Sequence, residues 1–194
     1  SFQSHRESDN SKFEIFYAGA ISEIRGIKTL LSALELLGDE FQLNLLGRFN
    51  SEELYLECQK TRGWEKVKYY GQLSRTEMYK IAARSDIALT LFHPVPNHLD
   101  ALPNKIFEYF AAQKPVLISD FPYWRLEFAA YDGVYYTNPL SPEDIACNIE
   151  LLRNKRGQLR AEGLKNRNAL YASETWENEA QTLLQLYSRI NDLR

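Results

Sequence analysis

Short hydrophobic runs alternate with amphipathic segments through the first two thirds of the chain. Runs rich in aromatic and β-branched residues, such as the one at 13–18, predict buried strands. Between them, apolar residues recur at helical spacing, as from Ile27 to Leu37, and predict helices. The pattern predicts strands at 13–18, 41–46, 67–70, 87–92, 116–119 and 134–136, and helices at 27–37, 51–62, 74–84, 103–113, 123–128, 141–153, 158–171 and 175–191.

This order of elements predicts the fold class. Successive strand, helix and strand units favour right-handed crossovers and a parallel sheet. We therefore expect an α/β fold with a single Rossmann-like domain, a mostly parallel sheet of about six strands with helices on both faces, and additional C-terminal helices. Residues 1–11 are polar and aperiodic, so we expect a linker or an artificial chain boundary there, and the domain at 12–194.

Local signals predict several helix ends. Ser74 and Glu77 stand three residues apart in the capping-box pattern, and Ser141 precedes a proline and two acids. Gly38 and Gly63 each follow an amphipathic segment, so we expect each of them to end a helix.

Composition and charge exclude several classes of partner. The formal net charge of −3 and the isoelectric point near 5.7 argue against a nucleic-acid surface, which is normally basic. No apolar run approaches the length of a membrane span, and we expect a cytoplasmic protein.

Cys58 and Cys147 lack paired spacing, so we expect two small buried side chains in a reducing compartment rather than a disulfide.

The segment 93–120 has the pattern of a ligand-binding loop. A loop with prolines at 94 and 96 leads to Pro103, where a short helix carrying Lys105 and Glu108 begins before the next apolar run. In an open parallel sheet, the loop that leaves a strand's carboxyl end and the helix start that follows it bind anionic ligands. We therefore expect the ligand site here.

These residues also resemble a known family. The most specific part is 101–125, which begins Ala101-Leu-Pro-Asn-Lys-Ile-Phe-Glu108, and the supporting parts are 17–26, 70–74 and Trp176. They resemble the C-terminal, donor-binding domain of GT-B retaining glycosyltransferases of the group 1 family, enzymes with two Rossmann domains that use nucleotide-sugars. The resemblance covers nearly the whole chain from Phe13.

The resemblance implies a role for an acidic pair eight positions apart. Glu108 takes the position that binds the ribose of the nucleotide, where the chemistry needs a group that only accepts hydrogen bonds. Asp100 takes the position near the transferred sugar, where the family often has glutamate; a plain loop aspartate is the alternative. Asp100 is the one candidate catalytic residue in this chain.

The resemblance also implies a diphosphate site. The family usually offers two cations in the loop after the first strand, and this chain has Ala20 at the first position and Arg25 at the second. Lys105 either faces the diphosphate or bends away to water. The backbone around Asn104 and Gly19 is expected to hold phosphate or sugar oxygens.

Three further expectations concern the base and metal binding. Gly71 begins the loop after the third strand, which in the family contacts the base through its backbone. His93 and His98 have no carboxylate or cysteine at ligand spacing, so we interpret them as loop residues. We expect neither a metal nor a further cofactor.

The leading hypothesis is the donor-binding half of a hexosyltransferase that uses a UDP-, GDP- or ADP-sugar. Its glycan or lipid-linked acceptor would bind an N-terminal Rossmann domain that this chain lacks, so the isolated domain should transfer little sugar. The full-length enzyme is expected to build bacterial surface polysaccharide, in the cytoplasm or peripherally at the inner face of the membrane. The alternatives are half of a nucleotide-sugar epimerase, or a stand-alone α/β nucleotide-binding or signalling module without catalytic activity.

Overall fold

The computed structural model describes residues 12–173, 180 and 183–184. Its centre is one six-stranded sheet in the order β3-β2-β1-β4-β5-β6, with every pair of neighbouring strands parallel. The strands are β1 Phe13–Ala18, β2 Phe41–Leu46, β3 Val67–Gly71, β4 Ile87–Thr90, β5 Val116–Ser119 and β6 Val134–Thr137. The predicted α/β fold, with a parallel sheet of six strands, is confirmed.

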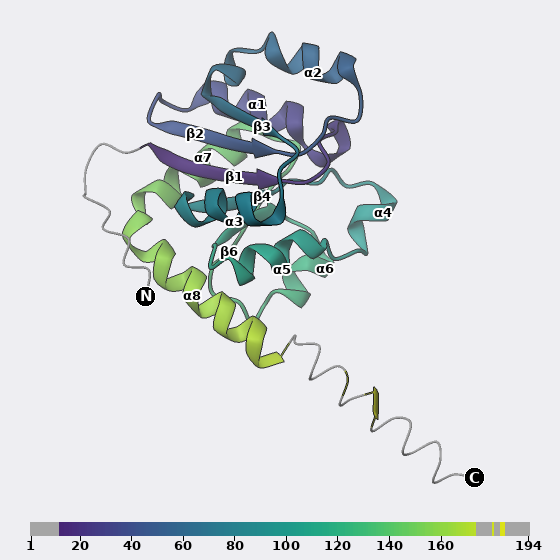
Figure 1. Ribbon diagram of the computed structural model, residues 1–194, viewed down its shortest axis with the longest axis vertical. Helices are drawn as coiled ribbons and strands as arrows, with labels where there is room; N and C mark the ends of the chain where they lie inside the picture. The colour runs from purple at the N-terminus through teal and green to yellow at the C-terminus, as the bar shows by residue number, and fades with distance from the viewer. Residues whose placement is uncertain (1–11, 174–179, 181–182, 185–194) are drawn as a thin grey trace.

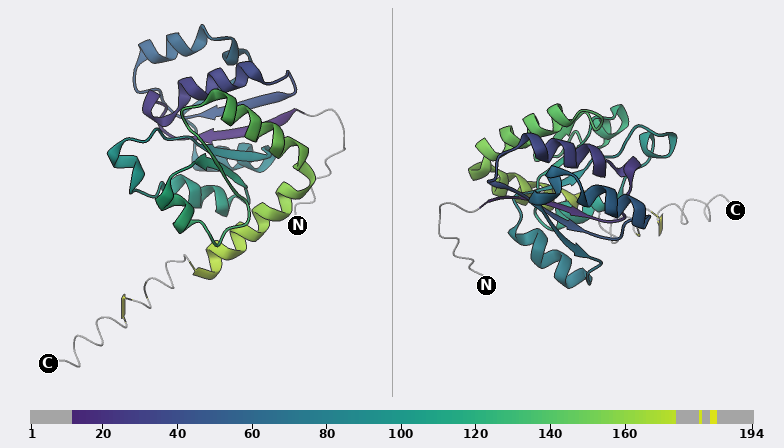
Figure 2. Two further views of the ribbon diagram at one scale, coloured as in Figure 1. Left: turned by 180° about the vertical axis from the view of Figure 1, so that it is seen from behind. Right: turned by 90° about the horizontal axis from the view of Figure 1, so that it is seen from above.

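Helices cover both faces of this sheet (Figures 1 and 2). The α-helices are α1 Ile27–Leu36, α2 Glu52–Gln59, α3 Arg75–Arg84, α4 Pro96–Leu99, α5 Asn104–Ala111, α6 Pro122–Glu127, α7 Pro142–Asn154 and α8 Arg156–Ser173. In Figure 1, α3 and α5 lie in front of the sheet, and α1 and α7 lie behind it. The second predicted C-terminal helix, at 175–191, falls almost entirely outside the described residues.

Alternation along the strands builds a separate core on each face. In β1, Phe13, Ile15 and Tyr17 point into the core beneath α1 and α7, and Phe16 and Ala18 point into the core beneath α3 and α5. Both sets are buried because helices cover both faces, which explains why the strands read as continuous apolar runs.

The structure corrects two predicted helix ends. Helix α1 ends at Leu36 with Leu37 in extended conformation, so Gly38 is not its cap. Helix α2 ends at Gln59, and Gly63 lies in a 3₁₀ helix at Arg62–Lys66. A Cβ at Gly63 would come within 2.1 Å of the Leu31 carbonyl oxygen, so this glycine is required by close packing rather than by helix termination.

The segment after β4 also differs from the prediction. The strand ends at Thr90 rather than at residue 92, and the four-residue helix α4 forms within the proline-containing loop. Pro96 stands at the first position of α4, where its missing N–H is not needed. The capping box predicted at Ser74 and Glu77 is present with both of its hydrogen bonds.

The two cysteines have different environments. Cys58 is buried on α2, as predicted, but Cys147 is exposed on α7, so the prediction for Cys147 is wrong. Both thiols are free. Among the described residues, no helix combines the length and hydrophobicity that a membrane-spanning segment needs.

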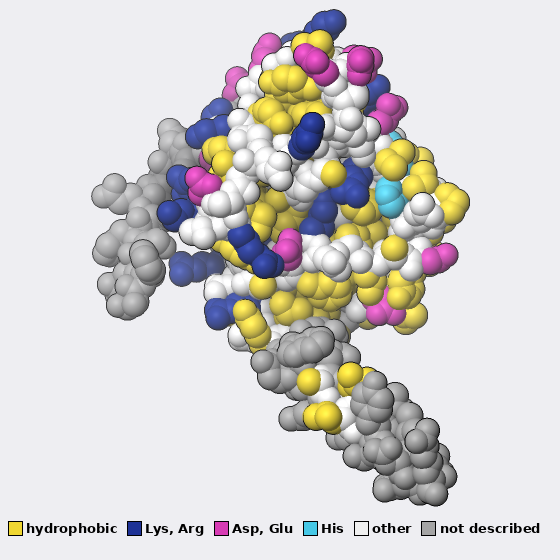
Figure 3. Space-filling model, turned by 45° about the vertical axis from the view of Figure 1, so that its right-hand side comes forward, with side chains coloured by type: hydrophobic (Ala, Val, Ile, Leu, Met, Phe, Trp, Pro, Cys, Tyr) yellow, Lys and Arg dark blue, Asp and Glu magenta, His cyan; other side chains and the backbone are white. Residues whose placement is uncertain are grey.

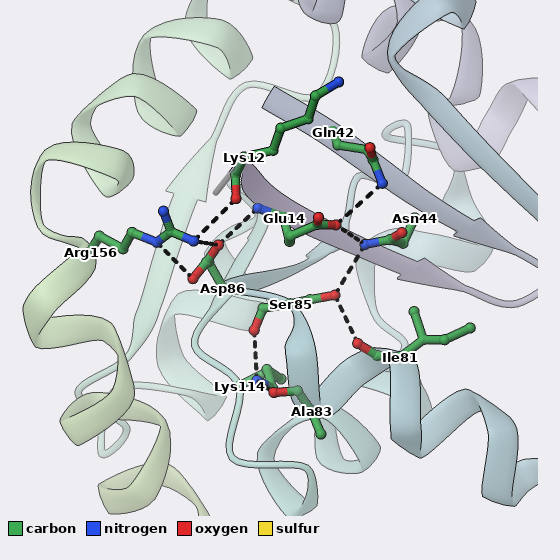
Figure 4. A network of polar contacts seen from close by, with 10 residues as sticks. All are labelled: Lys12, Glu14, Gln42, Asn44, Ile81, Ala83, Ser85, Asp86, Lys114 and Arg156. Carbon is green, nitrogen blue, oxygen red and sulfur yellow. Dashed lines mark hydrogen bonds and ion pairs between the residues drawn. The ribbon is translucent and has the colours of Figure 1, made fainter. Parts of the chain in front are cut away.

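A polar network closes the amino edge of the sheet (Figure 4). Asp86 accepts two hydrogen bonds from the Arg156 guanidinium, at 3.0 and 3.1 Å, and one from the backbone N–H of Glu14 at 2.8 Å. The Lys114 ammonium donates to the carbonyl oxygens of Ser85 at 2.7 Å and Ala83 at 3.1 Å. The charged groups at this edge therefore have partners, and they attach α8 and the loop before β5 to the sheet.

The carboxyl edge is built from close backbone contacts instead. Gly19, directly after β1, has a φ of +135°, and Gly47, directly after β2, has a φ of +132°. A Cβ at Gly47 would lie 1.8 Å from the Gly19 carbonyl oxygen. Only glycine permits this approach, and it leaves open space above the ends of β1, β2 and β3.

Candidate functional site

A hollow lies at the carboxyl edge of the three strands β1, β2 and β3. Its volume is about 430 Å³, and it is lined by the loops that leave these strands and by one residue of α3. The lining residues are Ala18, Gly19, Ala20, Leu46, Gly47, Arg48, Gln72, Leu73 and Met78. The crevice beyond the carboxyl ends of parallel strands is where open α/β sheets bind ligands.

Lys105 reaches the margin of this hollow from the first turn of α5. Its Nζ atom is enclosed and has no hydrogen-bond partner within the described residues. The Nζ lies 4.4 Å from the centroid of the Tyr17 ring, and only 2.8 Å from the place where a Cβ on Gly19 would stand. Of the two orientations considered from the sequence, the structure shows the one directed inward.

Two tyrosines hold the loop after β1 in place. The Tyr17 hydroxyl donates to the Ala20 carbonyl oxygen at 2.8 Å. The Tyr109 hydroxyl donates to the Ala18 carbonyl oxygen at 3.2 Å and accepts from the Ala18 N–H at 3.0 Å. Burial raises the pKa of both phenols, so they remain neutral near pH 7. Tyr17 therefore holds the loop through its hydroxyl, and its ring lies next to Lys105 Nζ.

Arg25 is a second basic residue close to Lys105. It ends a 3₁₀ helix at Glu23–Arg25, and its guanidinium carbon lies 5.3 Å from the centroid of the Phe92 ring. Lys105 Nζ lies 5.3 Å from the same centroid. Two basic side chains thus share one ring, and neither has an ion pair recorded within the described part of the chain.

This arrangement shifts the pKa of Lys105. Burial, followed by the positive charge of Arg25, lowers the pKa of the Lys105 ammonium to about 7, and the carboxylate of Glu108 opposes that shift. The ring faces attract a cation but accept no N–H hydrogen bond of ordinary strength. An anion placed between the two basic groups would stabilise both.

Glu108 stands one turn further along α5. Residues three apart share a helix face, so Glu108 and Lys105 face the same side. The Glu108 side chain is 40% exposed, and its Oε1 lies 3.2 Å from Nη2 of Arg75 on α3. One carboxylate oxygen therefore has a protein partner in the ligand-free chain. Figure 3 shows basic side chains in the middle of this face, bordered by hydrophobic side chains and by histidine.

The remaining predicted binding residues lie on loops or element ends. Asn104 is the exposed first residue of α5, and Pro103 before it makes no side-chain cap. The first backbone N–H groups of α5 therefore lack a side-chain partner. Gly71 is the last residue of β3, with a φ of +66°, and it directs Gln72 and Leu73 into the hollow.

Asp100 lies outside this group. It is exposed at the C-terminal end of α4 and is not among the residues that line the hollow. The neighbouring Ala101 carbonyl oxygen accepts a 2.8 Å hydrogen bond from Trp124 Nε1, which fixes the loop between α4 and α5. The catalytic assignment of Asp100 stays a prediction.

Of the two histidines, which the sequence placed in a loop, His93 lies in the loop after β4 and His98 lies in the short helix α4. His98 Nδ1 contacts the His93 carbonyl oxygen at 3.0 Å, and His93 Nε2 contacts the Thr29 hydroxyl at 3.1 Å. The ring of His98 packs on Phe92, with 4.5 Å between centroids. Within 12–173, 180 and 183–184, no group of three or more His, Cys, Asp and Glu side chains could hold a metal ion.

Sequence reasoning missed Arg48 and Arg75. Arg48 directly follows the glycine after β2 and lines both the hollow and a neighbouring one of about 620 Å³. Its place after a strand end was a usable signal. Arg75 is an exposed residue at the start of α3, and nothing in its local sequence predicts the contact with Glu108, which lies 33 residues away.

Several solved structures share this fold. Sucrose-phosphate synthase from Thermosynechococcus elongatus superposes with a TM-score of 0.79 at 18% identity, over 96% of this chain and 47% of that one. Anabaena HepE in complex with UDP and glucose gives 0.76 at 14% identity, over 92% and 49%. The catalytic domain of a Helicobacter pylori cholesterol-α-glucosyltransferase gives 0.67 at 14% identity, over 84% and 99%.

These likenesses establish the fold, and the chain spans about half the length of the first two proteins. No curated protein matches the chain at the significance required. The family model described as "Glycosyl transferases group 1" matches residues 2–169, which is most of the chain. The protein therefore belongs to the group 1 glycosyl transferases, the family that its motifs resemble.

Proposed function

We propose that this chain binds the nucleotide-sugar donor of a glycosyltransferase. The observation that carries the proposal is the enclosed Nζ of Lys105, which has no hydrogen-bond acceptor among the described residues and lies against the Gly19 loop near Arg25. Buried polar groups without partners are rare in folded proteins. A diphosphate would supply the missing acceptors and offset the repulsion between the two cations.

The other parts of a nucleotide-sugar fit the neighbouring groups. Glu108, on the same face of α5 as Lys105, would accept hydrogen bonds from the ribose hydroxyls. The backbone of the loop that begins at Gly71 would contact the base, since Gln72 and Leu73 line the hollow. The structures of Anabaena HepE with UDP and with UDP-glucose show that a protein of this fold binds such a ligand.

In the proposed reaction, the bond between the sugar and the diphosphate breaks and negative charge develops on the departing diphosphate. Arg25, Lys105 and the backbone N–H groups that begin at Asn104 would stabilise that charge. These groups belong to a fixed framework, because tyrosine hydroxyls hold the Gly19 loop. A glycan acceptor would approach from a part of the enzyme outside this chain.

Calorimetric titration with UDP-, GDP- and ADP-sugars tests the proposal. We expect one of the three nucleotides to bind, and we expect Glu108→Ala to weaken that binding by about tenfold, because a charged acceptor is lost. Glu127→Ala, which removes an exposed acid from α6, is the matched control and should leave the affinity unchanged.

Two results would count against this function. Absence of binding by all three nucleotide-sugars would remove the donor-site proposal. Equal affinities of the wild type and Glu108→Ala would show that the ribose is held elsewhere. Urea unfolding of each variant separates a loss of binding from a loss of stability.

A further inference from the structure

Lys105 differs from an ordinary phosphate-binding lysine in its surroundings. Its stem is partly exposed, but the Nζ atom is enclosed between the Tyr17 ring, the Phe92 ring and the Gly19 loop. A surface lysine keeps its charge by binding water. The enclosed Nζ has no hydrogen-bond partner among the described residues, so its charged form is costly until a ligand arrives.

We propose that Lys105 is a ligand-charged cation: a substantial fraction of it is uncharged in the empty site near neutral pH, and it takes up a proton when a diphosphate binds beside Gly19. This inference rests on the proposed function and concerns the regulation of the same site. Donor binding would then be coupled to pH. When the nucleoside diphosphate leaves, Lys105 would release the proton to solvent.

The neighbouring charges support this assignment. Arg25 shares the Phe92 ring with Lys105 and disfavours a second positive charge there. The carboxylate of Glu108 favours the charge, but its Oε1 is paired with Arg75. The Tyr17 phenol stays neutral because burial raises its pKa. A bound diphosphate would add negative charge next to Lys105 and would favour its protonated form.

Two histidines also lie in this region. His98 packs on the Phe92 ring, but its Nδ1 contacts the His93 carbonyl oxygen. His93 contacts the Thr29 hydroxyl, and burial lowers the pKa of its imidazole. His98 lies in α4 and His93 lies in the loop before it, whereas Gly19 directly adjoins Lys105 Nζ.

Gly19 allows Lys105 Nζ to lie close to the loop after β1. A Cβ at this position would lie 2.8 Å from Lys105 Nζ and 3.2 Å from its Cε. The glycine therefore lets the amine approach the loop backbone, and it leaves room for ligand oxygens at the place where the chain offers Ala20 rather than a basic residue. Lys105 supplies a cation from α5 next to the part of the loop that carries Ala20.

The test is calorimetry with UDP-, GDP- and ADP-glucose in buffers of different ionisation enthalpy. The phosphates of a nucleotide-sugar are diesters that stay ionised near pH 7, so protons taken up on binding come to the protein. With the pKa of Lys105 at about 7, we expect uptake of about half a proton at pH 7 and about one proton at pH 8.5.

Two substitutions separate the charge from its titration. Lys105→Arg keeps a cation that does not titrate, so it should bind the donor with no proton uptake. Lys105→Met should bind about tenfold or more weakly, because a charge-assisted contact is lost. His98→Gln, a control that removes the imidazole packed on Phe92, should leave the proton uptake of the wild type unchanged.

The outcomes distinguish the two proposals. Donor binding with the same heat in every buffer would overturn the ligand-charged cation and leave the donor site standing. Proton uptake that persists in Lys105→Arg and disappears in His98→Gln would assign the proton to the histidine. Absence of binding by all three donors, and by inorganic pyrophosphate, would overturn both proposals.

Discussion

Two lysines at opposite edges of the sheet have opposite environments. At the amino edge, Lys114 is 8% exposed, and its ammonium donates to the carbonyl oxygens of Ala83 and Ser85. At the carboxyl edge, Lys105 has an enclosed Nζ with aromatic rings around it and no hydrogen-bond partner in the described structure. The hydrogen bonds of Lys114 stabilise the fold, whereas Lys105 Nζ lacks an acceptor that a ligand could supply.

The same contrast holds for the arginines. Arg156 pairs with Asp86 through two nitrogens and donates to the Lys12 carbonyl oxygen, which joins α8 to the start of β1. Arg25 lies against a ring instead of a carboxylate. In an open parallel sheet, ligands bind beyond the carboxyl ends of the strands. The basic groups without an ion pair in the described structure therefore lie at the edge where we propose that the donor binds.

The most direct way to break this comparison is to remove each amine in turn. Lys114→Met should lower the free energy of unfolding by about 2–4 kcal/mol, because the carbonyl oxygens of Ser85 and Ala83 lose a charged donor and that of Ser85 is buried. Lys105→Met should leave the free energy unchanged or raise it, because an unpaired polar group is removed from an apolar wall. Urea unfolding at pH 7 measures both, and equal losses would contradict the contrast.

The pH dependence of stability sharpens the comparison. The pKa of Lys105 is about 7 in the folded chain, and an unfolded lysine has a pKa of about 10.4. Between these values the unfolded chain binds more protons, so the stability of the ligand-free protein should rise with pH. The rise is on the order of 2 kcal/mol between pH 7 and pH 9.

Lys105→Met provides the baseline for that measurement. Subtracting its urea-unfolding free energies from those of the wild type isolates the contribution of Lys105 from other titrating groups. The difference should grow more favourable for the wild type as pH rises. A difference that is flat from pH 7 to pH 9 would show that the amine keeps its ordinary pKa.

A smaller effect is expected from the glycines of the carboxyl edge. Gly19→Ala should cost about 1–3 kcal/mol of stability, because its φ of +135° is unfavourable for alanine and the Cβ would press on Lys105. Gly71→Ala is the matched control: its φ is +66° and no atom lies within 4 Å of the new Cβ, so it should cost about 1 kcal/mol. Thermal unfolding ranks the two, and a larger loss for Gly71→Ala would show that Lys105 does not press on the loop.

Much of the architecture follows from periodicity. The β1 run at 13–18 and the α3 capping box at Ser74 and Glu77 were predicted, because strand pairing and capping depend on nearby residues. Helix α4 and the role of Gly63 were not predicted, because they depend on proline geometry in a loop and on packing against a distant helix.

The site was predicted in part. The short helix with Lys105 and Glu108 was located from the loop, helix and strand order, and the family supplied the expected roles. The sequence left the orientation of Lys105 open, because its enclosure depends on Tyr17 and Phe92, which approach it only in the folded chain. The contact between Arg75 and Glu108 depends on the same folding and had no local signal.

The most direct test of the contrast between the two edges is the ¹³Cε chemical shift of each lysine, followed by nuclear magnetic resonance as pH is raised. The Lys105 resonance, identified by its absence in Lys105→Met, should titrate near pH 7 in the empty protein and above about pH 9 with a bound nucleotide-sugar. The Lys114 resonance should be unaffected by the ligand. Titration of Lys105 above pH 10 in the empty protein, with no change on ligand addition, would contradict the account.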